Sequence, residues 1–250
     1  MKEIVLSAIT IESVPRARGS KDALKVDEYS DLLIQKRVCY ELVRRLPPRS
    51  RSQVSGALKA AEGWHAGQLR GWTKYPYITH VYHVVSLLTT EMGVRDPVVL
   101  SAGALHDVVE DCNVAVEDLK IKFGERVASI VESESENLFD GRERYMEHFA
   151  KAPKRTLLVK MADRIDNLRF VALEGVSAFK KGASPEEAVW PMELVAKYVF
   201  EAEIYILPYA RKASAAGYDK LDKLIRMFKK DQSFARTYRI LLDSGKTVFD

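Results

Sequence analysis

The chain has 250 residues, of which 47% are hydrophobic and 30% charged, and its formal net charge is +4. This length can bury one sizeable core, and no apolar run approaches the roughly 20 residues that span a bilayer. The two cysteines, Cys39 and Cys112, give neither a disulfide framework nor the paired spacing of a zinc site. We therefore expect a protein of the reducing cytoplasm and do not expect secretion.

Composition divides the chain into three parts. Residues 1–21 form an N-terminal arm or linker. Residues 22–205 are interpreted as the main domain, because apolar residues recur there at helical spacing and strand patterns are nearly absent after residue 12. Residues 206–250 form a basic helical extension packed on that domain, and from Pro208 to Asp250 ten Lys/Arg stand against five Asp. The sequence predicts an all-α fold, a bundle of about nine or ten helices.

The expected helices are separated by residues that end helices, such as Pro47-Pro48, Gly93 and Gly124. Asp96 is the predicted N-cap of the helix that begins with Pro97. In chain order we expect helices over residues 22–46, 52–68, 78–92, 97–111, 116–123, 125–136, 153–169, 184–211 and 220–242.

The helix that follows Asp96 ends in a group of polar residues. His106, Asp107, Glu110 and Asp111 stand at i, i+1, i+4 and i+5, so they would crowd one side of an otherwise apolar helix. Burying these carboxylates is costly unless a positive charge lies among them, and a divalent metal is the obvious candidate. The alternative is a solvated helix end, although acids at a helix C-terminus oppose the helix dipole.

A loop with cations and aromatic residues precedes the helix expected over residues 78–92. An ordinary surface loop is one interpretation, but Arg70 and Lys74 could also face an anionic substrate, with Trp72 stacked on a base. The helix itself carries His80 and His83, one turn apart. A lone histidine on an apolar helix is more often a core residue than a ligand, and we interpret His83 in this way.

The helix over residues 153–169 carries an acid among apolar residues. Asp163 shares a face with Val159, Phe170 and the amide of Asn167. One interpretation of Asp163 is a partner for a nearby arginine, and the other is a metal ligand.

Taken together, five segments resemble the hydrolase domain of the RelA/SpoT family, within the wider HD-domain phosphohydrolases. The resemblance covers roughly residues 55–175, in the family's order and near its spacings. The five segments are residues 65–70 (HAGQLR), 76–80 (PYITH), 104–111 (ALHDVVED), 123–128 (FGERVA) and 160–169 (KMADRIDNLR).

The resemblance implies an HD-type helical bundle with one metal ion, usually manganese in the family. By ligand chemistry alone, two imidazoles and two carboxylates are compatible with Mn, Fe or Zn. The implied metal ligands are His80, His106, Asp107 and Asp163, the implied catalytic acids are Glu110 and Asp111, and the implied substrate contacts are Arg70 and Asn167.

The sequence departs from the family pattern at three places. The loop before His80 is one residue longer, so the family's lysine does not map securely onto Lys74, and Val81 stands where proline is common. Residues 133–137 replace a Gly-Val-Thr-Lys-like turn. These departures leave the metal ligands in place and concern the substrate.

The implied reaction removes pyrophosphate from the 3′ position of guanosine tetra- or pentaphosphate, the alarmones of the stringent response. A metal-activated water would attack, the acidic pair would position it and move a proton, and Arg70 would neutralise phosphate charge. No room is left after residue 175 for the family's synthetase domain, so we expect a small stand-alone alarmone hydrolase.

Three alternatives stay open at this stage. The protein could act on another nucleotide or on NADPH. It could be an antitoxin that destroys a toxic synthetase's product or a 3′-pyrophosphorylated tRNA. It could also be an inactive regulator that binds nucleotide or RNA through its basic tail.

Overall fold

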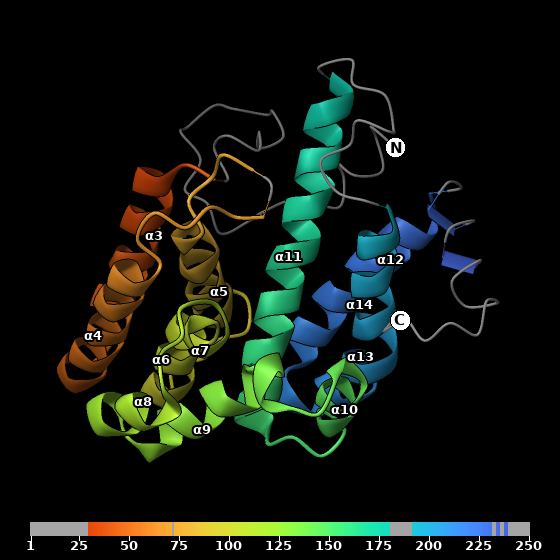
Figure 1. Ribbon diagram of the computed structural model, residues 1–250. Coiled ribbons are helices and arrows are strands. Elements are labelled where there is room, and N and C mark those ends of the chain that lie inside the picture. Colours follow the sequence, from red (N-terminus) through yellow and green to blue (C-terminus); the bar gives the residue numbers. More distant parts are fainter. Residues whose placement is uncertain (1–29, 72, 181–191, 232–233, 236–237, 240–250) are drawn as a thin grey trace.

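The computed structural model describes residues 30–71, 73–180, 192–231, 234–235 and 238–239 (Figure 1). In these ranges the chain is helical, and its one β feature is an isolated bridge between Leu69 and Pro76. The predicted all-α fold is confirmed. Across the same ranges we find no helix with the length and hydropathy to cross a bilayer. The arm of residues 1–21 and Trp72 lie outside the described residues.

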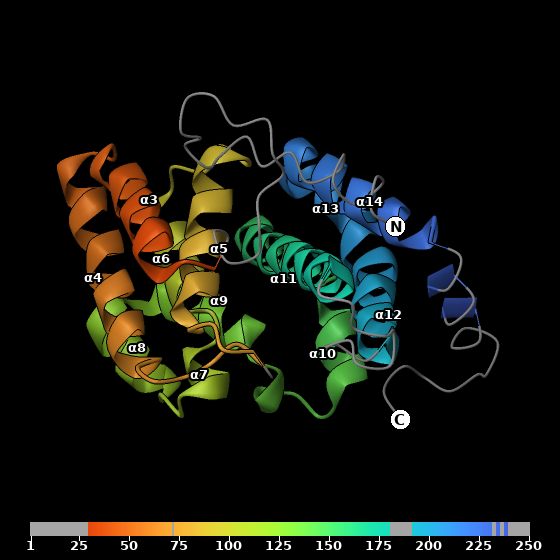
Figure 2. The same ribbon diagram turned by 90° about the horizontal axis from the view of Figure 1, so that it is seen from above.

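Four helices form the first half of the fold, and aspartate side chains cap the starts of two of them. They are α3 (Leu32–Arg44), α4 (Pro48–Trp64), α5 (Ile78–Thr90) and α6 (Pro97–Leu105). The Asp31 carboxylate accepts a hydrogen bond from the Ile34 N–H at 2.8 Å and so caps α3. The predicted N-cap of α6 is present, since Asp96 accepts from the Val98 N–H at 3.0 Å. In this half α3 packs on α5 and α4 packs on α6 (Figures 1 and 2).

The single helix predicted over residues 97–111 is wrong, because the chain leaves the helical path at Asp107 (φ −102°, ψ −2°). The His106 Nδ1 atom lies 3.0 Å from the Gly103 carbonyl oxygen, which a continued helix would offer to the Asp107 N–H. The next four residues form a separate turn, α7 (Val108–Asp111). The polar group is therefore divided between a helix end and a new turn, instead of following one helix face.

Short helices lead from this turn to the central helix. They are α8 (Val116–Phe123), as predicted, α9 (Glu125–Glu134), the 3₁₀ turn η1 (Glu136–Leu138) and α10 (Arg142–His148), which the sequence analysis missed. Gly124 separates α8 from α9 with φ at +88°, a conformation that favours glycine.

The longest helix, α11 (Lys154–Lys180), runs through the middle of the molecule, between α5 and the C-terminal helices (Figure 2). These are α12 (Met192–Glu201), the π-helical segment η3 (Ala202–Ile206), α13 (Leu207–Ala213) and α14 (Ala215–Lys229). Helices α13 and α14 pack on α11. The division of the chain after residue 205 falls inside η3 and stays a prediction.

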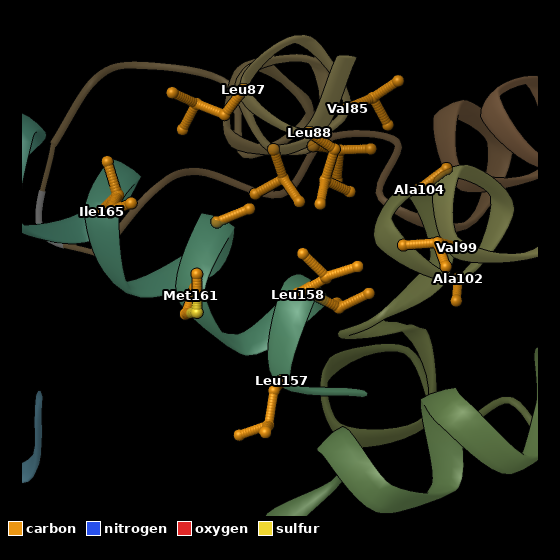
Figure 3. Close-up of a cluster of buried hydrophobic side chains, with 14 of the residues drawn as sticks. Val85, Leu87, Leu88, Val99, Ala102, Ala104, Leu157, Leu158, Met161 and Ile165 are labelled. Atoms are coloured by element: carbon orange, nitrogen blue, oxygen red, sulfur yellow. The ribbon is translucent and has the colours of Figure 1, made fainter. Parts of the chain in front are cut away.

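One part of the buried core lies where α5, α6 and α11 meet (Figure 3). Leu88 of α5, Val99 of α6 and Leu158 of α11 contribute to it, and full burial of one such side chain stabilises the fold by roughly 1.5–3 kcal/mol. Helices α5 and α6 approach closely at Gly103, where an added Cβ would lie 2.6 Å from the Leu88 Cδ1 atom. The histidines of these two helices are therefore held by a packed apolar layer.

Candidate active site

Four of the predicted site residues converge from three helices. The Nε2 atoms of His80, on α5, and His106, after α6, lie 3.2 Å apart. Asp107 Oδ2 lies 2.7 Å from His106 Nε2 and 3.6 Å from His80 Nε2. Asp163 Oδ1, on α11, lies 3.4 and 3.9 Å from the same two nitrogens. The structure thus brings all four predicted metal ligands to one place.

These distances fit a single divalent cation. Metal–ligand bonds of about 2.0–2.2 Å place neighbouring ligand atoms roughly 3 Å apart. The two imidazole nitrogens and Asp107 form the tightest group, with ligand atoms within 4.8 Å of one another, and Asp163 adds a carboxylate next to both rings. The residues present therefore fit the metal that the sequence implies.

The electrostatics of the group favour a positive charge at its centre. Burial opposes a charged imidazole, yet Asp107 and Asp163 raise the pKa of His106 to about 9. Burial would likewise raise the pKa of Asp107, but the adjacent His106 holds it below its usual range. Against the same burial cost, Lys160 and then His80 lower the pKa of Asp163. The two carboxylates are ionised at neutral pH and suited to a cation.

Further contacts hold the carboxylates of Asp107 and Asp163 in place. The Tyr77 hydroxyl donates a hydrogen bond to Asp107 Oδ2. Asn167 Nδ2 donates to Asp163 Oδ1 at 2.5 Å, and Lys160 Nζ lies 3.1 Å from Asp163 Oδ2. Such outer contacts orient the ligands of metal sites.

The two predicted catalytic acids differ from the ligands in exposure. Glu110 and Asp111 lie on α7 and are both exposed. The Glu136 N–H donates to Glu110 Oε2 at 3.1 Å, and Gln68 Nε2 donates to Asp111 Oδ2 at 3.0 Å. Partial burial and the charge of Asp107 raise the pKa of Glu110. The acids therefore stand at the solvent side of the ligand group.

Arg70 lies deeper than expected of a loop residue, with 3% of its surface exposed. Its Nη2 donates to Asp166 Oδ2 at 2.6 Å and to Asn167 Oδ1 at 3.0 Å. Its guanidinium carbon lies 3.9 Å from the centre of the Phe170 ring. The second nitrogen, Nη1, is buried without a hydrogen-bond partner among the described residues. Lys74, by contrast, is exposed.

Two residues beside the site were not predicted as site residues from the sequence. Asp166 is fully buried on α11, and His83, interpreted as a core histidine, has its Nδ1 atom 2.9 Å from Asp166 Oδ1. His83 is indeed buried, with 6% exposed, but its neighbour is an acid. One sequence feature could have indicated Asp166, because it is a second acid three residues after Asp163 on the same apolar helix.

Comparison with known proteins defines the class. A family profile described as "HD domain" matches residues 57–190, which is more than half of the chain. The protein therefore belongs to the HD domain family.

Within that family the chain is similar to proteins named guanosine-3′,5′-bis(diphosphate) 3′-pyrophosphohydrolase. It is 33% identical to the Xenopus tropicalis MESH1 protein over 126 residues, or 49% of this chain and 70% of that protein. Over 115 residues it is 39% identical to a Vibrio cholerae protein of that activity, covering 42% of this chain but only 16% of the relative.

A solved structure is also similar. It is described as a metazoan ortholog of SpoT that hydrolyzes ppGpp and plays a role in starvation responses, and it matches with a TM-score of 0.59 and 30% identity. The match covers 70% of this chain and 94% of that chain.

Proposed function

We propose that the protein hydrolyses the 3′-pyrophosphate of guanosine tetra- and pentaphosphate, releasing pyrophosphate and leaving GDP or GTP. The observation that carries this proposal is the convergence of His80, His106, Asp107 and Asp163 in a chain of the HD domain family. The activity named for relatives at 33% and 34% identity supports the choice of substrate.

His80, His106, Asp107 and Asp163 would hold one divalent ion, and we propose manganese. The mixed set of imidazoles and carboxylates accepts manganese, and the RelA/SpoT resemblance favours it over iron and zinc. When bound, the ion lowers the pKa of a water molecule and draws charge from a phosphoryl oxygen.

The chain's own acids would handle the proton. The water oxygen forms a bond to the phosphorus attached to the ribose 3′ oxygen, the bond from that phosphorus to the 3′ oxygen breaks, and the 3′ oxygen takes a proton. Glu110 and Asp111 orient the water, accept its proton and return one to the leaving oxygen. Their exposure on α7 supports this role, because a substrate can approach them.

Arg70 and Asn167 would contact the nucleotide. Arg70 Nη1 has no hydrogen-bond partner among the described residues, so this donor is available for a phosphate oxygen. The exposed Lys74 adds a second cation on the same loop. Stacking of Trp72 on the base stays a prediction.

The test is release of pyrophosphate from guanosine tetraphosphate in the presence of manganese. We expect turnover by the wild-type protein and by Asp222→Ala, which removes a carboxylate of a surface ion pair on α14. Asp163→Ala should show no turnover above background. A metal-loaded wild-type protein without turnover would contradict the proposal and leave the role of a binding regulator.

A substrate panel separates the finer alternatives. Equal amounts of guanosine tetraphosphate, its adenosine analogue, NADPH and a 3′-pyrophosphorylated tRNA are compared, and the guanosine compound should be hydrolysed fastest. Preference for the tRNA would instead indicate an antitoxin with a toxic synthetase as partner. A role in the stringent response, in the cytoplasm, follows from the proposed substrate.

A further inference from the structure

A buried carboxylate that none of the roles above uses lies behind the metal ligands. Asp166 is on α11, one turn beyond Asp163, and none of its surface is exposed. Its Oδ2 atom lies 2.6 Å from His80 Nδ1 and 2.6 Å from Arg70 Nη2. Its Oδ1 atom lies 2.9 Å from His83 Nδ1. Two histidines of α5 and the loop arginine thus share one acid.

The two acids of α11 contact opposite sides of one imidazole ring. Asp163 Oδ1 lies 3.4 Å from Nε2 of His80, whereas Asp166 Oδ2 lies 2.6 Å from its Nδ1. His80 is therefore held between two carboxylates that a single helical turn separates.

The contact determines which nitrogen of His80 carries the proton. An ionised carboxylate only accepts hydrogen bonds, so Nδ1 of His80 must be the donor to Asp166. The neutral ring then has its lone pair on Nε2, the atom that faces His106 Nε2 at 3.2 Å. This is the tautomer that binds a metal through Nε2.

The Oδ2 atom of Asp166 also holds Arg70 in place. Nη2 of Arg70 donates to Asp166, and the guanidinium rests on the Phe170 ring 3.9 Å away. Because one carboxylate binds both groups, the position of Arg70 is tied to the orientation of the His80 ring.

We propose that Asp166 is a positioning residue that keeps His80 in the metal-binding tautomer and holds Arg70 beside it. The part that concerns Arg70 rests on the proposed function. The part that concerns His80 requires only that this site binds a divalent ion.

The first test is metal affinity, measured without nucleotide by competition between the protein and a fluorescent chelator for manganese. An amide at residue 166 cannot accept hydrogen bonds from three donors, so Asp166→Asn should weaken binding by roughly 10- to 100-fold. The matched control is Glu91→Gln, which also removes a carboxylate from an arginine of α11, Arg169, but not at the metal ligands. The control should bind manganese as wild type does.

The second test determines the tautomer of the His80 ring by NMR. In ¹⁵N-histidine-labelled protein with zinc as a diamagnetic ion, the His80 signal should show a protonated Nδ1 and a metal-bound Nε2. In metal-free Asp166→Asn the neutral ring should shift towards the other tautomer, whereas in Glu91→Gln it should not. A merely structural role of Asp166 would leave the tautomer of a folded variant unchanged.

Two further variants keep the proposal testable if Asp166→Asn does not fold. Arg70→Met removes the cation but leaves the contact between Asp166 and His80, so it should retain wild-type metal affinity. The double variant, Arg70→Met with Asp166→Asn, leaves no unpaired buried charge and should bind manganese as weakly as predicted for Asp166→Asn alone.

The outcomes separate this inference from the proposed function. Wild-type metal affinity and an unchanged tautomer in Asp166→Asn or in the double variant would overturn the inference, whatever the enzyme hydrolyses. Weakened binding in a protein that does not hydrolyse alarmones would support the inference and contradict the proposed function.

Discussion

Helix α11 borders two sets of buried charges that are balanced differently. On the active-site side, the carboxylates Asp107, Asp163 and Asp166 have two cations beside them, Arg70 and Lys160. Their other close contacts include the imidazoles of His80 and His106, which must be neutral to bind a metal. With both rings neutral, three carboxylates face two cations, and this side has a surplus of negative charge.

Away from this site, two buried carboxylates beside α11, Glu201 and Glu91, have two cations each. Arg142 Nη2 and Arg164 Nη2 bind Glu201 Oε2 at 2.9 and 3.0 Å, which joins α10 and α11 to the end of α12. At the end of α5, Glu91 binds Arg169 of α11 and Lys220 of α14 in the same way.

The difference indicates two uses of buried acids. A carboxylate with its cations already in the chain contributes to stability and has no need of a ligand. Carboxylates with too few cations create a site whose charge a divalent ion completes. Four predictions follow from this contrast, from the largest effect to the smallest.

Removal of the ion should have the largest effect. After exhaustive chelation, alarmone hydrolysis should fall to background, and added manganese should restore it most fully, because the ion completes the charge of the active-site carboxylates. Pyrophosphate release measures both steps. Full turnover in a protein shown to be free of metal would contradict the view that the active-site carboxylates need a bound ion.

Among the active-site residues, substitution of a proposed metal ligand and substitution of a proposed catalytic acid should have different effects on metal content and turnover. Asp163→Ala should lower the metal content, because it deletes one of four ligands. Glu110→Gln should keep the metal and slow turnover by roughly 100-fold, since it removes a proton-transfer group. Metal analysis beside activity distinguishes them, and a metal-free Glu110→Gln would reassign Glu110 as a ligand.

Away from the active site, Glu91→Gln should reduce stability in a pH-dependent way. Partial burial opposes ionisation, but Arg169 and Lys220 lower the pKa of Glu91 from 4.5 to about 2. A lowered pKa stabilises the fold above the unfolded value, by on the order of 2 kcal/mol, and this contribution is lost as pH falls from about 4.5 to about 2.

Urea unfolding of both proteins at pH 7, 4.5 and 3 measures this effect. The difference in unfolding free energy should be largest at pH 7 and shrink as the pH falls. Asp222→Asn, in a surface pair with Arg226, should change stability by less than about 0.5 kcal/mol. A constant difference at all three pH values would show that charge is not the cause.

The basic tail should have the smallest effect. Reversal of four cations on and just after α14 should leave alarmone hydrolysis within a few-fold of wild type, because the site residues lie between Arg70 and Asn167. Lys229 binds Glu203 at 2.7 Å, so a triple variant that keeps Lys229 controls for lost stability. The four changes are Lys223→Glu, Arg226→Glu, Lys229→Glu and Lys230→Glu, and the triple variant omits Lys229→Glu. A folded triple variant without hydrolysis would place the tail in the active site.

The sequence predicts local features of the fold well. The cap at Asp96, the helix α8 and the start of α5 depend on neighbouring residues and on helical spacing, and all three are found in the structure. The break at Asp107 was missed because the spacing of residues 97–111 suits a helix, whereas the contact of His106 with the Gly103 carbonyl favours the turn.

At the site, the approach of His80, His106, Asp107 and Asp163 was predicted through a family resemblance and not through spacing. The contacts of Asp166 could not be predicted in this way. Its partners Arg70 and His83 lie far away in the sequence, and only the packing of α11 against α5 brings them together. The same holds for Glu201 and its two arginines.

The close approach of α5 and α6 at Gly103 gives a glycine an influence on the proposed metal site. A methyl group there would lie 2.6 Å from Leu88 Cδ1 and 3.4 Å from Val84 Cγ1, so these side chains of α5 would have to move. His80 stands on α5, and the ring of His106 rests against the Gly103 carbonyl. The separation of the two proposed ligands therefore depends on a residue that is not itself a proposed ligand. Efforts to change metal preference in this scaffold can begin at the helix contact and leave the ligands themselves unaltered.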